Sequence, residues 1–316
     1  MRKRDPQLSR FDPTGEVNLE NPAAVELAIK AILDRIYGAS YDAALLAPGI
    51  DALVQAHRGR YPGLLRCDTL YHDLRHALET GLTMARLLEA HAKSLPAGTL
   101  NDIDGGLALL GILLALFHDV GLLRRDAEAH LQGAVLTPIH EERGVEFMRH
   151  YLAETALSPL AEKAELIMPT KLVFRIPDTW PRLDRKIASM VATADMLSQL
   201  ADCCYLEKCW HFLYEEFRGF GVAGTPDSAY PDRETLMAKS SGFYANMVVP
   251  RLEQEFSGMH RLMDSYYCGS NPYQESIASN FNYLANTLLS RDFSRLRRRP
   301  RTFIGDPAEP DEGPRP

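Results

Sequence analysis

The sequence predicts an all-α protein, and three observations carry that prediction. Apolar residues recur at the spacing of one helix face, i, i+3, i+4 and i+7, in segments spread along the chain. The period-two alternation of strands is absent apart from an ambiguous stretch, KLVFRI at 171–176. No internal repeat or linker-like composition divides the chain. We therefore expect one multi-helix domain at 23–290, an extended polar arm at 1–22, and a basic, then Pro-rich and acidic, disordered tail at 291–316.

The expected helices follow one another with few interruptions. The first spans 25–37, after Asn21 and Pro22, a pair typical of an N-cap and a first helical position. The nearly unbroken apolar run GLALLGILLALFHDVG at 106–121 predicts a buried helix that delivers His118 and Asp119. The remaining helices are expected at 50–57, 70–92, 140–155, 159–168 with Ser158 as N-cap, 184–200 running on into 205–217, 234–256 and 275–289.

Composition excludes several classes of protein. The apolar run ends after roughly a dozen residues, short of the ~20 needed to span a bilayer, and the basic N-terminus lacks the apolar region of a signal peptide. We therefore expect a cytoplasmic protein without a membrane partner. The net charge of −7 argues against nucleic acid as a partner. The Arg run at 291–301 is read as a solvated helix end, with a nucleic-acid or anionic-lipid contact as the alternative. The five cysteines have no metal-binding or disulfide spacing and are read as free thiols.

Histidine and aspartate side chains recur where helices should bring them together. His72 and His76 lie four residues apart in LYHDLRHALE, so on a helix both imidazoles project from the same face. His118 and Asp119 differ by about 100° around a helix, which would let one ion contact both. Each pair taken alone also fits a capped core or surface site. Together they indicate a metal centre.

A further carboxylate belongs to the same pattern. Asp195 follows Ile187 and Val191 at i, i+4 and i+8, so it should face the core. A buried anion needs a cationic partner, which could be a metal ion or an Arg or Lys side chain. Two imidazoles and two carboxylates suit Zn²⁺, Fe, Mn²⁺ or Mg²⁺ better than a thiolate-seeking ion.

In this order, H…HD…D along helices, the set resembles the HD-domain metal-dependent phosphohydrolases. Finer motifs, spread over roughly 70–256, resemble the 3′,5′-cyclic nucleotide phosphodiesterases within that superfamily. They are LYHDLRHALE at 70–79, similar to Y-H-N-x-x-H-A with Asp73 in place of Asn; LDRKIASMVATADMLSQL at 183–200, similar to the A-D-L segment; YLEKCWHFLYEEF at 205–217, similar to the helix that follows; and SSGFYANMVVP at 240–250, similar to Q-x-G-F-x6-P.

The resemblance implies roles for individual residues. His76, His118, Asp119 and Asp195 would hold the tighter metal, Zn or Fe/Mn, and Asp119 would also bridge to a second metal, Mg or Mn. His72 would be the general acid, with Asp73 and Glu142 among the carboxylates that could orient these imidazoles. IHEERG at 139–144 resembles the H-x-x-x-G segment of binuclear members, so His140 is a candidate for the second metal or its water shell, unless it simply starts a helix.

Pocket residues follow from the same resemblance. Tyr71 belongs to the Y-H-N motif, Thr170 and Lys171 lie in IMPTK, which resembles an A-T-D stretch, and Phe243 would clamp the base. Three departures weaken base recognition: the glutamine that normally reads the purine is Ser240, an asparagine of the A-D-L segment is Ser198, and the segment after the His-Asp pair is only HDVG.

We therefore expect a metal-dependent phosphoric ester hydrolase. The first hypothesis is a phosphodiesterase in which hydroxide between two metal ions attacks a cyclic nucleotide or similar small diester, while His72 protonates the leaving oxygen. The alternatives are a hydrolase of a nucleotide mono- or polyphosphate, favoured by Lys171 and the missing glutamine, and a catalytically silent regulator that binds a nucleotide or a protein. The oligomeric state is left open.

Overall fold

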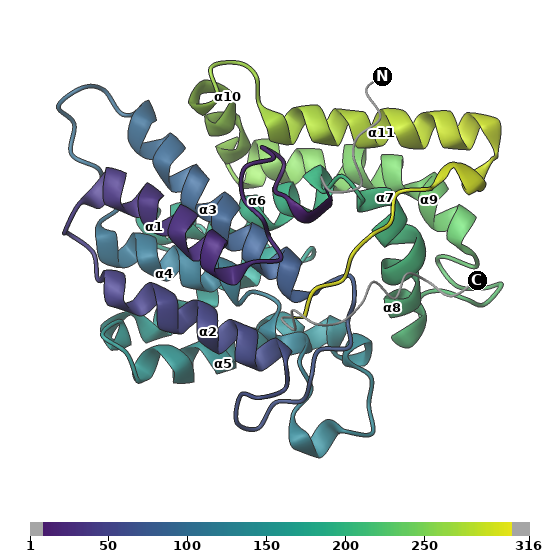
Figure 1. Ribbon diagram of the computed structural model, residues 1–316, viewed down its shortest axis with the longest axis horizontal. Helices are drawn as coiled ribbons and strands as arrows, with labels where there is room; N and C mark the ends of the chain where they lie inside the picture. The colour runs from purple at the N-terminus through teal and green to yellow at the C-terminus, as the bar shows by residue number, and fades with distance from the viewer. Residues whose placement is uncertain (1–8, 305–316) are drawn as a thin grey trace.

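The computed structural model describes residues 9–304 and is built from helices, with no strand in that range (Figure 1). The all-α prediction is therefore confirmed. The α-helices of the described chain are α1 Pro22–Tyr37, α2 Leu46–His57, α3 Leu74–Ser94, α4 Gly105–Leu116, α5 His140–Ala153, α6 Arg182–Ala201, α7 Tyr205–Lys208, α8 Tyr214–Gly219, α9 Arg233–Phe243, α10 Leu262–Tyr266 and α11 Pro272–Ser290.

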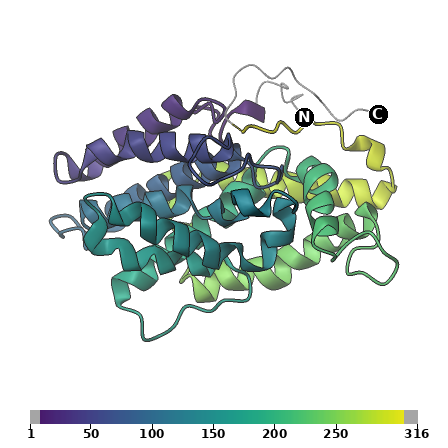
Figure 2. The same cartoon turned by 90° about the horizontal axis from the view of Figure 1, so that it is seen from below.

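Helix α4 forms the centre of the core. Every residue of α4 except Gly106 is buried, and the helix packs against α2, α3 and α6. Figure 2 shows the N-terminal helices α1 and α2 stacked on one side of the segments that follow them. Within the described chain, only Gly105–Leu122 has a length and composition that would suit a membrane span, and 94% of that stretch is buried inside the domain. Its apolar character thus serves core packing.

Shorter 3₁₀ and π segments connect or extend the α-helices. The helix expected at 159–168 is the 3₁₀ helix η6, Ser158–Thr170, and its flanking residue is Leu157, so the prediction of Ser158 as N-cap is wrong. The remaining segments are the 3₁₀ helices Ala43–Leu45, Val120–Leu122, Asp126–Glu128, Gly133–Ile139, Met259–Arg261 and Phe293–Arg295, and the π-helices Cys209–Leu213, Tyr244–Val248 and Arg251–Glu255.

The stretch KLVFRI forms a turn rather than a strand. The buried guanidinium of Arg251 donates hydrogen bonds to the carbonyl oxygens of Pro169, Lys171 and Phe174. These carbonyls are therefore satisfied by one side chain from a distant part of the chain, and they need no neighbouring strand.

Both described ends of the chain lie against the domain. Near the N-terminus, the buried Asp12 carboxylate pairs with Arg86 of α3 at 2.7 Å. After α11 the chain runs back across the molecule to Phe303, which is buried (Figure 1). Some side chains in 9–21 and 296–304, such as Asp12, Leu19 and Phe303, are thus buried, which the expected extended arm and solvated tail did not include. The parts of those two expectations that concern residues 1–8 and 305–316 lie outside the described residues.

Candidate metal centre and catalytic site

The N-terminus of α3 positions the first two histidines. Asp73 is its N-cap and accepts a hydrogen bond from the backbone N–H of His76 at 3.0 Å. His76 therefore lies in the first turn of α3, whereas His72 precedes the helix. The prediction that both lie one turn apart on a helix is wrong, because the Asp73 cap starts the helix between them. The two rings are still neighbours, with centroids 6.2 Å apart.

His118 and Asp119 occupy the turn after α4. The helix ends at Leu116, so the two side chains are not carried on its surface as predicted. The Nδ1 of His118 lies 2.8 Å from the carbonyl oxygen of Ala115 in the last turn of the helix. That contact fixes the ring and turns its Nε2 away from the backbone. The change of direction after Leu116 lets two adjacent residues point to one place.

Four donor atoms converge below the floor of a cavity. His76 Nε2 and His118 Nε2 are 3.2 Å apart, and Asp195 Oδ1 of α6 lies 3.2 Å from the first and 3.4 Å from the second. Asp119 Oδ2 lies 3.0 Å from His118 Nε2 and 3.5 Å from His76 Nε2. All four side chains are buried. The sequence-predicted ligands of the tighter metal are thus brought together.

This arrangement fits a metal ion. Two ligands bonded to one ion at about 2.0–2.1 Å lie ~2.9–3.4 Å apart in octahedral or tetrahedral geometry. The spacings among His76, His118 and Asp195 fall within that range, and the longest spacing, from Asp119 to His76, is 3.5 Å. Asp119 Oδ2 is buried and makes no well-aligned hydrogen bond, although it lies 3.0 Å from His118 Nε2, so this anionic oxygen has room for a further cationic partner. The group His76, His118 and Asp195 could therefore hold a metal ion, and Asp119 Oδ2 lies beside its two histidines.

The electrostatics of the cluster agree with that reading. Burial alone would lower the pKa of His118, but the carboxylates of Asp119 and Asp195 raise it well above its ordinary value. Burial would raise the pKa of Asp119, but the neighbouring imidazoles lower it well below its ordinary value. Two buried carboxylates thus need positive charge at this position, which a divalent ion supplies.

The Nδ1 atoms of His76, His118 and His140 each contact another group of the protein. His140 Nδ1 lies 2.7 Å from the carbonyl oxygen of Thr137, and His76 Nδ1 lies 3.4 Å from the hydroxyl of Ser198. Together with the His118 contact to Ala115, each ring is held at Nδ1 and presents Nε2 to the cluster. This is the usual arrangement of histidine ligands, whose second nitrogen is oriented by a backbone or side-chain group.

His140 extends the cluster on the other side of Asp119. Its Nε2 lies 3.4 Å from Asp119 Oδ1, while Asp119 Oδ2 faces His76 and His118. Two glycines allow this approach: a Cβ on Gly121 would meet the carbonyl oxygen of His140 at 1.9 Å, and one on Gly144 would meet that of His118 at 3.3 Å. Asp119 thus has one oxygen toward each side, as a bridging ligand requires.

His72 is held by a carboxylate that the sequence reasoning missed. Glu216 of α8 accepts from the backbone N–H of Tyr71 at 2.7 Å through Oε1, and its Oε2 lies 2.7 Å from His72 Nδ1. Burial would lower the pKa of His72, but the carboxylates of Glu216, Asp119 and Asp195 raise it to about 9. Asp73 and Glu142, which were expected to orient the imidazoles, have other contacts. Asp73 caps α3, and Glu142 pairs with Lys171 at 2.6 Å. Glu216 lies in YLEKCWHFLYEEF at 205–217, one of the segments that carry the resemblance, and this position could have identified it as a site residue.

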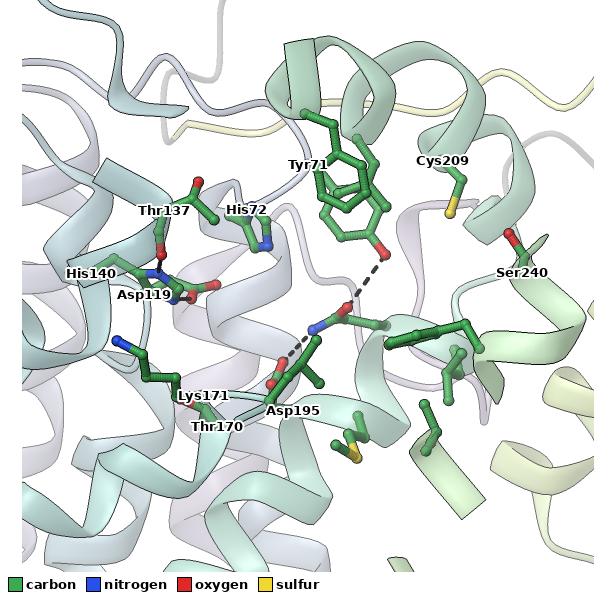
Figure 3. A pocket seen from close by; sticks show the side chains of 18 of the residues that line it. Tyr71, His72, Asp119, Thr137, His140, Thr170, Lys171, Asp195, Cys209 and Ser240 are labelled. Carbon is green, nitrogen blue, oxygen red and sulfur yellow. Dashed lines mark hydrogen bonds and ion pairs between the residues drawn. The ribbon is translucent and has the colours of Figure 1, made fainter. Parts of the chain in front are cut away.

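A cavity of about 510 Å³ opens above the cluster. In Figure 3, His72, Asp119, Thr137, His140, Thr170 and Lys171 lie on one side of Asp195, and Cys209 and Ser240 lie on the other. Tyr71, Thr170, Lys171, Ser240 and Phe243 line it as expected. Ser198 does not. Its hydroxyl lies behind His76, 2.9 Å from Thr80 Oγ1, because Ser198 is on the inner face of α6.

Gln199 is a second cavity residue that the sequence reasoning missed. Its Nε2 donates to Asp195 Oδ1 at 2.5 Å, and its Oε1 accepts from the hydroxyl of Tyr71 at 3.3 Å. The amide therefore links a metal-ligand candidate to the cavity wall. Its place one turn after Asp195 on α6 is the signal that could have found it.

Comparison with known proteins identifies a family model that matches part of the chain. A family model described as Npun_R2479-like matches residues 124–266, less than half of the chain. The chain shows no significant match to a curated protein or to a solved structure. The matched segment contains His140, Asp195 and Glu216, while the first part of the cluster lies before it. The description of that family states no activity.

Proposed function

We propose that this protein is a metal-dependent phosphoric ester hydrolase that acts on a small phosphodiester. The observation that carries the proposal is the convergence of His76, His118 and Asp195 at the floor of a cavity, with the buried Asp119 Oδ2 beside both histidines. The resemblance to HD-domain phosphodiesterases points to the same chemistry, with a cyclic nucleotide as its usual diester.

The ligand set favours Zn²⁺, Fe or Mn²⁺ at this position, since it combines imidazole and carboxylate donors. His140 and the second oxygen of Asp119 would hold a further ion such as Mg²⁺ or Mn²⁺. Ions held there supply positive charge that offsets the repulsion between two anions and lower the pKa of water toward about 7. The reaction replaces one P–O ester bond with a bond to the oxygen of water.

His72 has the properties of the acid that the leaving oxygen needs. It lines the cavity beside Asp119, and its Nδ1 is held by Glu216, so Nε2 is available to the substrate. Burial lowers the pKa of His72, but Glu216, Asp119 and Asp195 together raise it to about 9, which favours the protonated imidazole. A positioned acid of this kind typically contributes roughly 10²–10⁴ in rate. An inactive nucleotide-binding regulator would have no need of the His72–Glu216 pair.

A diester fits better than a polyphosphate. Lys171 was the feature that favoured a more anionic substrate, but its ammonium donates to Glu142 at 2.6 Å and to the carbonyl oxygen of Pro138 at 2.8 Å. Its charge is thus already neutralised within the protein. No other Lys or Arg is among the residues that line the cavity near the cluster.

The test starts from metal analysis of protein purified without chelator. We expect close to one transition-metal ion per chain, and hydrolysis of bis-p-nitrophenyl phosphate that exceeds hydrolysis of p-nitrophenyl phosphate. Removal of the metal should abolish both reactions, and Mn²⁺ or Zn²⁺ should restore them. Preference for the monoester would shift the proposal to a phosphomonoesterase. If the protein bound no metal even after supplementation, the proposal of a metal-dependent hydrolase would be refuted.

A further inference from the structure

The end of the cavity beyond Asp195 is built from apolar side chains. Met196 and Leu200 of α6, Leu213, Leu236 and Val248 line it, and Phe217 and Tyr230 stack on one another at 5.3 Å between centroids. Figure 3 shows two other lining residues, Cys209 and Ser240, on the side of Asp195 away from His140 and Lys171. The cavity thus has one charged end and one apolar end.

Three polar side chains that line the cavity beside or beyond Asp195 are hydrogen-bonded within the protein. Ser240, which stands where the resemblance implies a base-reading glutamine, donates to the carbonyl oxygen of Leu236 at 2.9 Å. Gln199 uses its amide nitrogen on Asp195 and its amide oxygen on Tyr71. Lys239 donates to the carbonyl oxygen of Ala229 at 2.8 Å. A nucleobase placed there would lose its hydrogen bonds to water and gain few from these side chains.

Several exposed residues that line the cavity are apolar as well. Leu172, Val173 and Phe243 are 40%, 79% and 37% exposed, and all three line the cavity. Within the described part of the chain they are three of nine large hydrophobic residues that are exposed. Exposed apolar side chains gathered around one opening are typical of a binding site for an apolar ligand.

From these observations we propose that the substrate is a phosphodiester of a hydrophobic alcohol, with its phosphate at the metal cluster and an alkyl chain in the apolar end. The inference rests on the proposed function, because it assigns the group attached to the phosphate. It also accounts for the absent base-reading glutamine: an alkyl chain needs shape and apolar area, and both are present, whereas a base needs donors and acceptors.

The test uses metal-loaded full-length protein and three diesters that share p-nitrophenol: the methyl, butyl and thymidine 5′ esters of p-nitrophenyl phosphate. Burial of a methylene group favours binding about fourfold. We expect kcat/KM for the butyl ester to exceed that for the methyl ester about tenfold or more, and the thymidine ester to show no such gain. In calorimetry, dibutyl phosphate should bind about tenfold or more tightly than dimethyl phosphate, with a negative heat-capacity change.

Variants of exposed residues test whether the gain with alkyl chain length arises in the cavity. The double variant Val173→Ser, Phe243→Ser should lower the butyl-to-methyl ratio in both measurements. Leu100→Ser should keep the ratio, because Leu100 is 90% exposed and does not line the cavity. A ratio that the double variant does not change would overturn the assignment.

The outcomes separate the two proposals. Turnover of the methyl and butyl esters with equal kcat/KM, or preference for the thymidine ester, would overturn the apolar substrate while hydrolysis stands. Tight binding of dibutyl phosphate without turnover of any ester would leave the apolar subsite and refute hydrolysis. Absence of both turnover and chain-length-dependent binding would refute both.

Discussion

The Nδ1 of His72 lies 2.7 Å from Oε2 of Glu216, across a separation of 144 residues in the chain. One residue comes just before α3 and the other belongs to α8. The same carboxylate accepts the backbone N–H of Tyr71 through its other oxygen. Glu216 therefore fixes the position of the segment and the charge of the imidazole together.

The first prediction separates acid catalysis from metal binding. His72→Ala should lower turnover of a diester by roughly 10²–10⁴ and leave metal content intact, because His72 lies outside the four-atom cluster. Asp119→Ala should lose both turnover and metal. Elemental analysis and kinetics on the two purified variants check this. Equal metal content in the two variants would contradict the division of roles.

The second prediction concerns pH. His72 acts in its protonated form, so the rate should fall as pH rises through its pKa, which Glu216 raises. Glu216→Gln removes the carboxylate charge, lowers that pKa, and should move the alkaline fall of kcat to lower pH. Glu215→Gln is the matched control, because Glu215 pairs with Arg218 and Arg233 instead. An unchanged profile for Glu216→Gln would show that His72 does not set the alkaline limb.

The third prediction concerns metal removal. A ligand that binds only the folded state stabilises it by about 4 kcal/mol when its free concentration is a thousand times Kd. Chelation should therefore lower Tm, since Asp119 and Asp195 lose their neutralising charge, and Zn²⁺ or Mn²⁺ should restore it. Calorimetry with and without chelator measures the shift. In Asp195→Asn the shift should be smaller, and a full shift there would place the ion elsewhere.

The fourth prediction tests the close approach at Gly121. In Gly121→Ala the added Cβ would meet the carbonyl oxygen of His140 at 1.9 Å. We expect a loss of about 1–3 kcal/mol in the free energy of unfolding from this overpacking, and weaker retention of the second metal. Gly106→Ala is the control: its Cβ would meet nothing closer than 3.4 Å, in helix α4. It should be neutral or stabilising by up to about 1 kcal/mol.

The fifth prediction tests the C-terminal segment. The backbone N–H of Phe303 donates to Asp73 Oδ2 at 2.8 Å, while Asp73 Oδ1 caps α3, and the Phe303 ring is buried. Phe303→Ala should cost about 3 kcal/mol of stability and reduce activity by loosening the cap beside His72 and His76. Arg299→Ala, at an exposed side chain, should change stability by less than about 0.5 kcal/mol. Urea unfolding of both variants compares them.

The sequence by itself determined the fold class and the identity of the four cluster residues. Helical spacing marks buried faces directly, because a helix in a large core must bury a continuous stripe. That is why α1, α4, α6 and α11 were found within a few residues. Histidine and aspartate at the ends of such stripes also stand out, since charged groups rarely enter a core without a partner.

Only the tertiary structure decided how these residues meet. Helix ends depend on caps and turns, so the Asp73 cap and the end of α4 at Leu116 put His72, His118 and Asp119 outside helices. The Glu216 contact and the Phe303 contact join residues far apart in sequence, and no local pattern encodes such pairings. The apolar end of the cavity arises in the same way, because its side chains come from separate helices and face one space only once the chain is folded.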